Sequence, residues 1–330
     1  MLRNIVLCLI CLFSACTLCP AQPPAGTLHL EREIPLPGVE GRIDHLSADV
    51  AGRRVFVSAL GNGTVEIVDM VQGKRTGEIK GLKEPQGVLY VPSNGAVYVA
   101  GGGDGTIRSF DSHSLKPIQN VSLGADADNL RYDSAHSQLL AGYGSGAIAV
   151  LGLDLSRHAN LALPAHPESF QLAADGQHVF VNLPDNQSIA SVDLTSQSVN
   201  PTWAHPSATA NFSMALDKTI HRLFIPCRHP ARLLVVNSDT GGITAWLATV
   251  GDADDIFVDE VHRMLYVIGG DGLVDVLYVR EHDALVSRAR VPTAPGARTG
   301  LYVPEWNKLL VAAPRQGTTE ARLLVFAVEQ

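Results

Sequence analysis

Short apolar stretches alternate with glycine-rich turns along most of the chain. The first clear unit holds the β-rich run Arg54–Ser58, the turn Gly61–Gly63 and the return segment Thr64–Asp69, in which apolar and polar residues alternate. Glycine and asparagine allow the positive φ of a tight hairpin turn, and a period of two is typical of a strand with one buried face. Asp69 is placed to cap the next turn, and Thr76–Ile79 predicts a fourth, outer strand. The stretch therefore predicts a small antiparallel sheet.

Six further units repeat this pattern. Their equivalent large apolar positions are about 42 residues apart and are occupied by Phe56, Tyr98, Leu140, Phe180, Phe224, Tyr266 and Leu310. A repeat of that length is typical of a four-stranded propeller blade, and such sheets bury their faces only by stacking in a closed ring. The predicted fold is therefore all-β: a seven-bladed β-propeller of four-stranded antiparallel blades.

Two segments need separate interpretation. The seventh unit ends at Gln330 before a fourth strand, whereas Thr27–Ile34 predicts a strand ahead of the first unit. We expect this N-terminal strand to close the last blade and cover its edge. Asp154–Ala162 fits either a short helical turn or the outer strand of the third blade.

The first residues predict an export signal. Arg3 precedes the apolar run Ile5–Phe13, and a small-residue cleavage site ends at Ala21. We expect residues 1–21 to be a signal peptide, residues 22–330 to be one propeller domain, and the protein to be periplasmic or extracellular. The alternative is a lipoprotein modified at Cys16.

Composition limits the classes of partner. Hydrophobic residues make up 46% of the chain and charged residues 18%, and the formal net charge is −8. This acidic balance argues against nucleic acid, whose binding depends on Lys and Arg. The apolar run Ile5–Phe13 is short for a membrane span, so we expect no transmembrane segment. We also expect a monomer, in which Cys227 is a buried strand residue without a disulfide partner.

The run Phe56-Val57-Ser58-Ala59 with the following Gly-Asn-Gly-Thr-Val-Glu-Ile-Val-Asp resembles the repeat of the YVTN family of β-propeller proteins. The resemblance implies a seven-bladed propeller related to the haem d1 domain of nitrite reductases and, more distantly, to lactonase-type propellers. Later units depart from the signature, as at Ile225-Pro226-Cys227 and Val311-Ala312-Ala313. Since the repeated residues belong to strands and turns, the resemblance indicates fold more than activity.

Polar residues gather where each unit's innermost strand begins. In a propeller these positions surround one mouth of the central channel, where we expect a ligand to bind. The candidates for ligand binding are Asp44, His45, Asp128, Asn129, His166, Glu168, Asp254, Asp255 and Arg298, and the same positions also include Gln86, Asp126, Asn211 and Asp252.

Carboxylates and imidazoles at these positions are oxygen and nitrogen ligands for a divalent metal. The metal candidates are Glu168, Asp128 and Asp254, which would hold a Ca²⁺-like ion. The alternative is that Asp and Asn cap turns and strand ends at these places. The Asp-Ala-Asp at 126–128 returns at 252–254, which fits either a site or repeat ancestry.

No nucleotide-binding, serine-hydrolase or zinc-protease motif is present, and no Cys-x-x-Cys-His for covalent haem. The leading hypothesis is an exported, non-enzymatic binding or scaffold propeller that engages a small molecule or a protein and requires no cofactor. The alternatives are a metal-dependent lactonase-type hydrolase and a periplasmic haem or redox-associated propeller, in which His45 or His166 would be the axial ligand.

Overall fold

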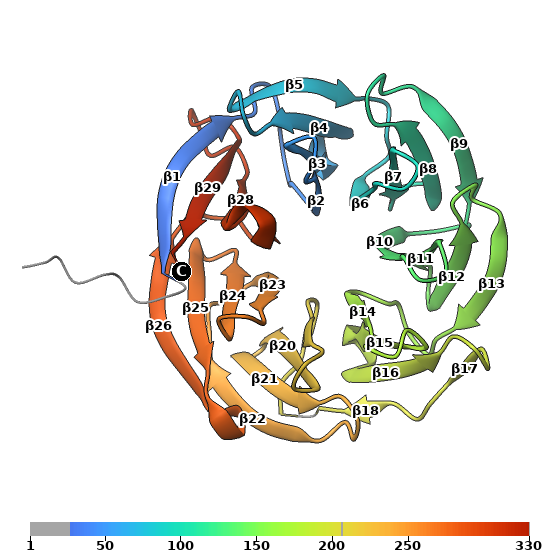
Figure 1. Cartoon of the computed structure of the whole chain (residues 1–330), viewed down its shortest axis with the longest axis vertical. Coiled ribbons are helices and arrows are strands. Elements are labelled where there is room, and N and C mark those ends of the chain that lie inside the picture. Colours follow the sequence, from blue (N-terminus) through green and yellow to red (C-terminus); the bar gives the residue numbers. More distant parts are fainter. Residues whose placement is uncertain (1–26, 206, 330) are drawn as a thin grey trace, which may run out of the picture.

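The computed structural model describes residues 27–205 and 207–329 as a ring of seven antiparallel sheets around a central channel (Figure 1). In blades 1 to 6 the strands follow one another in chain order from the channel outward. The predicted fold class, a seven-bladed propeller, is confirmed. The predicted signal peptide and the alternative at Cys16 lie outside the described residues, in which no helix is long and apolar enough to cross a membrane.

Blades 1 to 3 are four-stranded sheets. Their strands are β2 (Leu46–Asp49), β3 (Arg54–Ala59), β4 (Thr64–Asp69) and β5 (Lys74–Ile79); β6 (Pro85–Val91), β7 (Ala96–Gly101), β8 (Thr106–Asp111) and β9 (Pro117–Ser122); and β10 (Ala127–Asp133), β11 (Gln138–Tyr143), β12 (Ala147–Gly152) and β13 (Arg157–Ala162).

Blade 4 differs because two short segments, β17 and β18, both pair with β16 in place of one outer strand. The strands of blades 4 to 6 are β14 (Phe170–Leu172), β15 (His178–Leu183), β16 (Ser188–Asp193), β17 (Ser198–Val199) and β18 (Trp203–Ala204); β19 (Ala215–Asp217), β20 (Arg222–Arg228), β21 (Ala231–Asn237) and β22 (Ile243–Ala248); and β23 (Ala253–Asp259), β24 (Met264–Gly269), β25 (Leu273–Val279) and β26 (Leu285–Pro292). Short 3-10 turns occur at η1 (Leu60–Asn62), η2 (Pro184–Asn186), η3 (Glu281–Asp283) and η4 (Pro304–Trp306).

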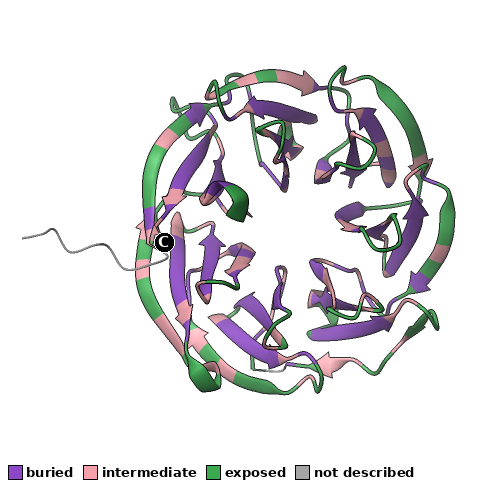
Figure 2. Ribbon diagram, viewed as in Figure 1, coloured by how far each residue is buried: buried purple, intermediate pink, exposed green. Residues whose placement is uncertain are grey.

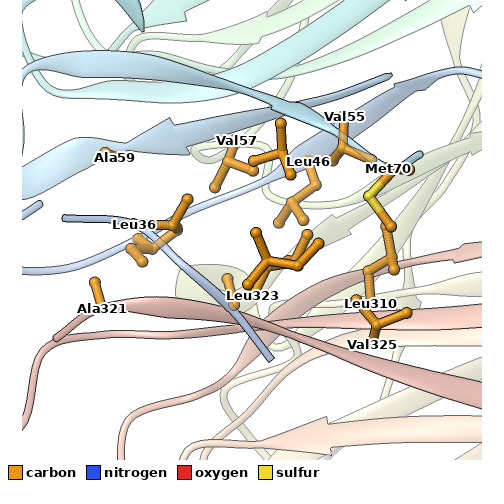
Figure 3. Close-up of a cluster of buried hydrophobic side chains, with 14 of the residues drawn as sticks. Leu36, Leu46, Val55, Val57, Ala59, Met70, Leu310, Ala321, Leu323 and Val325 are labelled. Atoms are coloured by element: carbon orange, nitrogen blue, oxygen red, sulfur yellow. The ribbon is translucent and has the colours of Figure 1, made fainter. Parts of the chain in front are cut away.

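Blade 7 is built from both ends of the described chain. β27 (Thr299–Val303), β28 (Lys308–Ala313) and β29 (Arg322–Val328) form its inner three strands, and β1 (Leu28–Pro35) pairs with β29 as the fourth. The N-terminal strand thus closes the last blade, as predicted. Beside this junction, Leu36 and residues of blade 1 pack against Leu323 and its neighbours in blade 7 (Figure 3).

The core lies between neighbouring blades. Middle strands are almost wholly buried, whereas the outermost strands β5, β9, β13, β22 and β26 are largely exposed at the rim (Figure 2). Asp69 accepts hydrogen bonds from the backbone N–H groups of Val71 and Gln72, so its predicted capping role is confirmed. Cys227 is buried in β20, as expected, and burial raises the pKa of its thiol to about 12. The alternative at Asp154–Ala162 is settled in favour of a strand, β13.

Candidate functional site at the channel mouth

Strand register places one residue of each blade at an equivalent point beside the channel. In blade 1 the inner strand ends at Asp49, paired with Arg54, and Asp44 lies five residues before it. In each of the other blades we likewise take the residue five positions before the equivalent pair of the inner and second strands. The resulting set, which we call the mouth ring, is Asp44, Gln86, Asp128, Glu168, Phe212, Asp254 and Arg298. Four of its seven members are carboxylates, contributed by blades 1, 3, 4 and 6.

Irregular pairing sets the direction of several of these side chains. The register of the inner strand shifts at Gln86, at Asp128 and at Asp254, each time between the first pair with the second strand and the regular ladder. Such bulges redirect side chains and are common beside binding sites. Close packing adds to this, since a Cβ at Gly87 would lie 2.2 Å from the carbonyl oxygen of Asp128. Glycine therefore lets blades 2 and 3 approach each other at the ring.

Three side chains at the mouth form a potential metal centre. One potential ligand atom from each of Asp128, His166 and Glu168 lies within 4.8 Å of the other two. Asp128 is only 5% exposed, and the other two are half-buried. Among the described residues this is the one group of three or more such side chains that meets this distance.

The imidazole of His166 is held in one orientation. Its Nδ1 lies 2.5 Å from the carbonyl oxygen of Gly144, which can only accept a hydrogen bond, so Nδ1 carries the proton. In this tautomer Nε2 is the ring nitrogen that carries the lone pair. Metal-binding histidines are commonly oriented in this way by a backbone carbonyl or a carboxylate.

Burial and mutual repulsion raise the pKa values of three mouth-ring acids, Asp128, Glu168 and Asp254. Burial and the nearby Glu168 raise the pKa of Asp128 well above its usual value. Burial and the charge of Asp254 raise the pKa of Glu168 to about 7. Burial likewise raises the pKa of Asp254 to about 6, although Arg228 acts against it. A nearby cation stabilises the ionised form of carboxylates that are buried and close together in this way.

Among the described residues, arginines form ion pairs with Asp44 and Asp254 of the mouth ring but not with Asp128 or Glu168. Arg42 donates to Asp44 at 2.7 Å, and Arg228 to Asp254 at 2.6 Å. The Arg228 guanidinium also packs over the ring of Phe212, 4.2 Å from its centroid. Arg298 pairs with Asp252 at 2.9 Å rather than with the ring carboxylates.

A second tier lies one residue deeper in each blade. Here Asn129 Nδ2 lies 3.1 Å from Nε2 of His45, and Arg131 donates to Asn129 Oδ1 at 2.6 Å. Asp255 lies 3.7 Å from Nδ1 of His45 and accepts a hydrogen bond from the backbone N–H of Gly300. Burial lowers the pKa of His45, but the charges of Asp255, Asp44 and Asp128 raise it to about 10 overall.

This tier opens into a cavity of about 260 Å³ within the channel. Residues of six blades line it, including His45, Asn129, Arg131 and Asp255 among polar groups and Leu89, Phe257 and Leu301 among apolar ones. The channel therefore offers a polar mouth followed by a partly apolar chamber.

The structure groups the predicted site residues unevenly. Asp128, His166 and Glu168 meet, as do His45, Asn129 and Asp255, whereas Asp254 is paired with Arg228 outside the potential metal centre. Gln86 donates to Asp126, 3.1 Å away, at the edge of the mouth.

Asn211 takes no part in the mouth ring. It is fully buried and donates to the carbonyl oxygen of Ser188, and the ring position belongs to its neighbour Phe212. Sequence analysis also missed Arg131 and Arg228. The spacing of the repeat could have identified Phe212, because it follows Glu168, the ring position of blade 4, by about one repeat of 42 residues. The arginines have no comparable signal in the sequence.

Each of the two Asp-Ala-Asp repeats places one aspartate in a turn and one in the mouth ring. The first residue of each, Asp126 or Asp252, adopts a positive φ, of 34° or 52°, and its carbonyl accepts a glycine N–H. Asp tolerates this left-handed conformation. The last residue of each, Asp128 or Asp254, belongs to the mouth ring. One aspartate therefore forms the turn, and the other faces the site.

A larger cavity, of about 640 Å³, lies away from this chemistry between blades 4 and 5. It is bordered by the loops after the inner strands, at the opposite face of the ring, and by Trp203 in the broken outer strand of blade 4. Its two histidine–aspartate pairs, His178–Asp175 and His221–Asp239, are substantially exposed. None of the predicted site residues borders it.

Comparison with protein-family models and with curated protein sequences finds no match. Among solved structures, the chain is similar to hydrazine synthase of Kuenenia stuttgartiensis, with a TM-score of 0.77 and 16% identity over 89% of this chain and 99% of the other. It is also similar to a chain in the crystal structure of a mitotic checkpoint complex, with a TM-score of 0.79 and 15% identity over 99% and 100% of the two chains. At this identity the likeness establishes the propeller fold.

Proposed function

We propose that the protein is an exported binding propeller of the YVTN type whose channel mouth holds a divalent metal on Asp128, His166 and Glu168. The observation that carries this proposal is the convergence of three ligand atoms within 4.8 Å. The hydrogen bond that fixes the His166 tautomer and the raised pKa values of both acids support it.

The donor set favours a transition metal. Calcium takes oxygen ligands almost exclusively, whereas imidazole with carboxylates suits Zn²⁺ or Mn²⁺. The sequence had suggested a Ca²⁺-like ion on Glu168, Asp128 and Asp254. With His166 in the place of Asp254, we propose Zn²⁺ or Mn²⁺ as the ion. Three protein ligands leave coordination positions for a small-molecule ligand.

Metal binding is tested by calorimetric titration of Zn²⁺ and Mn²⁺ into chelator-treated protein. Glu168→Gln and Asp128→Asn are each expected to weaken the tighter ion by about 100-fold, because each removes a charged ligand. Glu84→Gln is the matched control, since Glu84 is exposed in the loop before β6 and should leave affinity unchanged. Equal affinity in all four proteins, or stoichiometric binding by none, would refute the proposed metal centre.

Hydrolysis of a lactone is a second candidate function, favoured by one observation. Asp254 has a pKa raised by burial to about 6 and lies outside the potential ligand group, so it is available as a general base near neutral pH. If the metal-loaded protein opens γ- or δ-lactones, Asp254→Asn should reduce kcat by about 100-fold or more while Zn²⁺ affinity is retained. Rates equal to those of buffer with wild-type protein would exclude this candidate.

A further inference from the structure

The channel cavity contains a half-buried cation, from which no carboxylate of the described residues lies within ion-pair distance. Arg131 projects from β10, and its guanidinium hydrogen bonds are to Asn129 Oδ1 at 2.6 Å, the Leu130 carbonyl at 2.8 Å and Ser169 Oγ at 3.4 Å. All three acceptors are neutral. Within residues 27–205 and 207–329, no carboxylate forms an ion pair with it, unlike Arg42, Arg228 and Arg298. A buried charge is costly unless it is paired.

Hydrogen-bond donors also outnumber acceptors around Arg131. The Arg131 Nε–H makes no hydrogen bond to the described residues, although the side chain lines the cavity. Asn129 Oδ1 is occupied by Arg131, so the Asn129 amide presents Nδ2 to His45. With a pKa of about 10, His45 is protonated at neutral pH and its Nε2–H then faces another donor. Two cationic side chains therefore flank the Asn129 amide, and the carboxylate oxygens that face His45, from Asp44 and Asp255, each lie 3.7 Å from its ring nitrogens.

We propose that this cavity binds a small monocarboxylate with an apolar body, whose carboxylate is anchored by Arg131. A carboxylate accepts two hydrogen bonds from a guanidinium fork, and its remaining lone pairs suit the donors of His45 and Asn129. Leu89, Phe257 and Leu301 line the same cavity and fit the apolar body. At about 260 Å³ the cavity is below the range typical of drug-sized ligands, so the ligand is short.

This inference rests on the proposed function only in placing the ligand in the channel. The mouth-ring acids repel an anion, and a metal held by Asp128 and Glu168 reduces that repulsion. Metal binding and carboxylate binding nevertheless use different residues. They can therefore fail independently.

The test is calorimetric titration with 4-methylpentanoate, and with 4-methylpentanamide as the uncharged analogue, in the presence of Zn²⁺. Wild type should bind the acid at least about tenfold more tightly than the amide, and Arg131→Met should abolish this preference. Arg131→Met should keep its Zn²⁺ affinity. Arg157→Met, an exposed arginine on β13 of the same blade, is the control and should match wild type.

Other variants keep the test decisive if Arg131→Met does not fold. Leu89→Phe fills the cavity from the neighbouring blade 2 and should weaken the acid while leaving Arg131 in place. Arg131→Lys keeps the charge without the fork and should bind with intermediate affinity. Failure of wild type to prefer the acid, an unchanged preference in Arg131→Met, or an unchanged affinity for the acid in Leu89→Phe, would overturn the inference. Loss of Zn²⁺ binding in Glu168→Gln with the acid preference retained would count against the metal centre alone.

Discussion

A chain that begins at Leu36, without β1, is expected to lose its cooperative thermal transition or to melt at least about 10 °C below a chain that begins at Thr27. Without β1, the backbone of β29 from Arg322 to Val328 would become an exposed edge. The truncation would also remove Leu28 and Ile34, which are 7% and 0% exposed. Burial of each such side chain contributes about 1.5–3 kcal/mol, and an open edge promotes aggregation.

The measurement is circular dichroism melting together with sedimentation, which detects aggregates. A synthetic peptide of residues 27–35 should restore part of the transition, because strand addition satisfies the exposed edge. Point variants separate packing from pairing. Ile34→Ala should lower the free energy of unfolding by about 2–4 kcal/mol and Leu30→Ala, at 42% exposure, by far less. A truncated chain with the melting temperature of the longer one would show that the ring does not need β1.

The architecture was accessible from the sequence because its physical causes are local and repeated. Turn glycines and period-two strands recur about every 42 residues, and the edge left by the seventh unit called for a strand that Thr27–Ile34 could supply. Outer strands were harder to predict. Blade 4 breaks its outer strand into β17 and β18, and no residue pattern in that segment indicates where pairing resumes.

The sequence predicts which positions surround the channel mouth, but it does not predict which of their side chains contact one another. Counting from the strand starts found six of the seven mouth-ring positions and missed blade 5, where the loop before β19 has no turn signature and Asn211 was taken for Phe212. Which side chains meet depends on bulges and on contacts between blades. For example, Arg228 ends the second strand of blade 5 yet reaches Asp254 in blade 6, and nothing in its own strand indicates that partner.

Stability in chelator should decrease as the pH rises from about 5 to about 9. Glu168 and Asp254 have folded-state pKa values of about 7 and about 6, and His45 of about 10. All three are above the unfolded-state values, so the folded protein binds more protons in these intervals and loses stability as they dissociate. The two acids act from about pH 4 to 7, each on the order of 3 kcal/mol, and His45 acts from about pH 6.5 to 10, on the order of 5 kcal/mol.

Zn²⁺ should reverse the acid part of this trend. Because the metal binds ionised carboxylates, its stabilising effect should be small near pH 5 and grow through about pH 7 as Glu168 loses its proton. Urea denaturation with and without Zn²⁺ across this range measures both effects. Glu168→Gln should flatten the acid part and abolish the Zn²⁺ effect. His45→Gln should flatten the alkaline part and steepen the acid part, because the charge of His45 lowers the pKa values of Asp128 and Glu168. A wild-type stability that rises towards pH 9 in chelator would contradict the raised pKa values, and with them the electrostatic argument that the mouth ring is built around a cation.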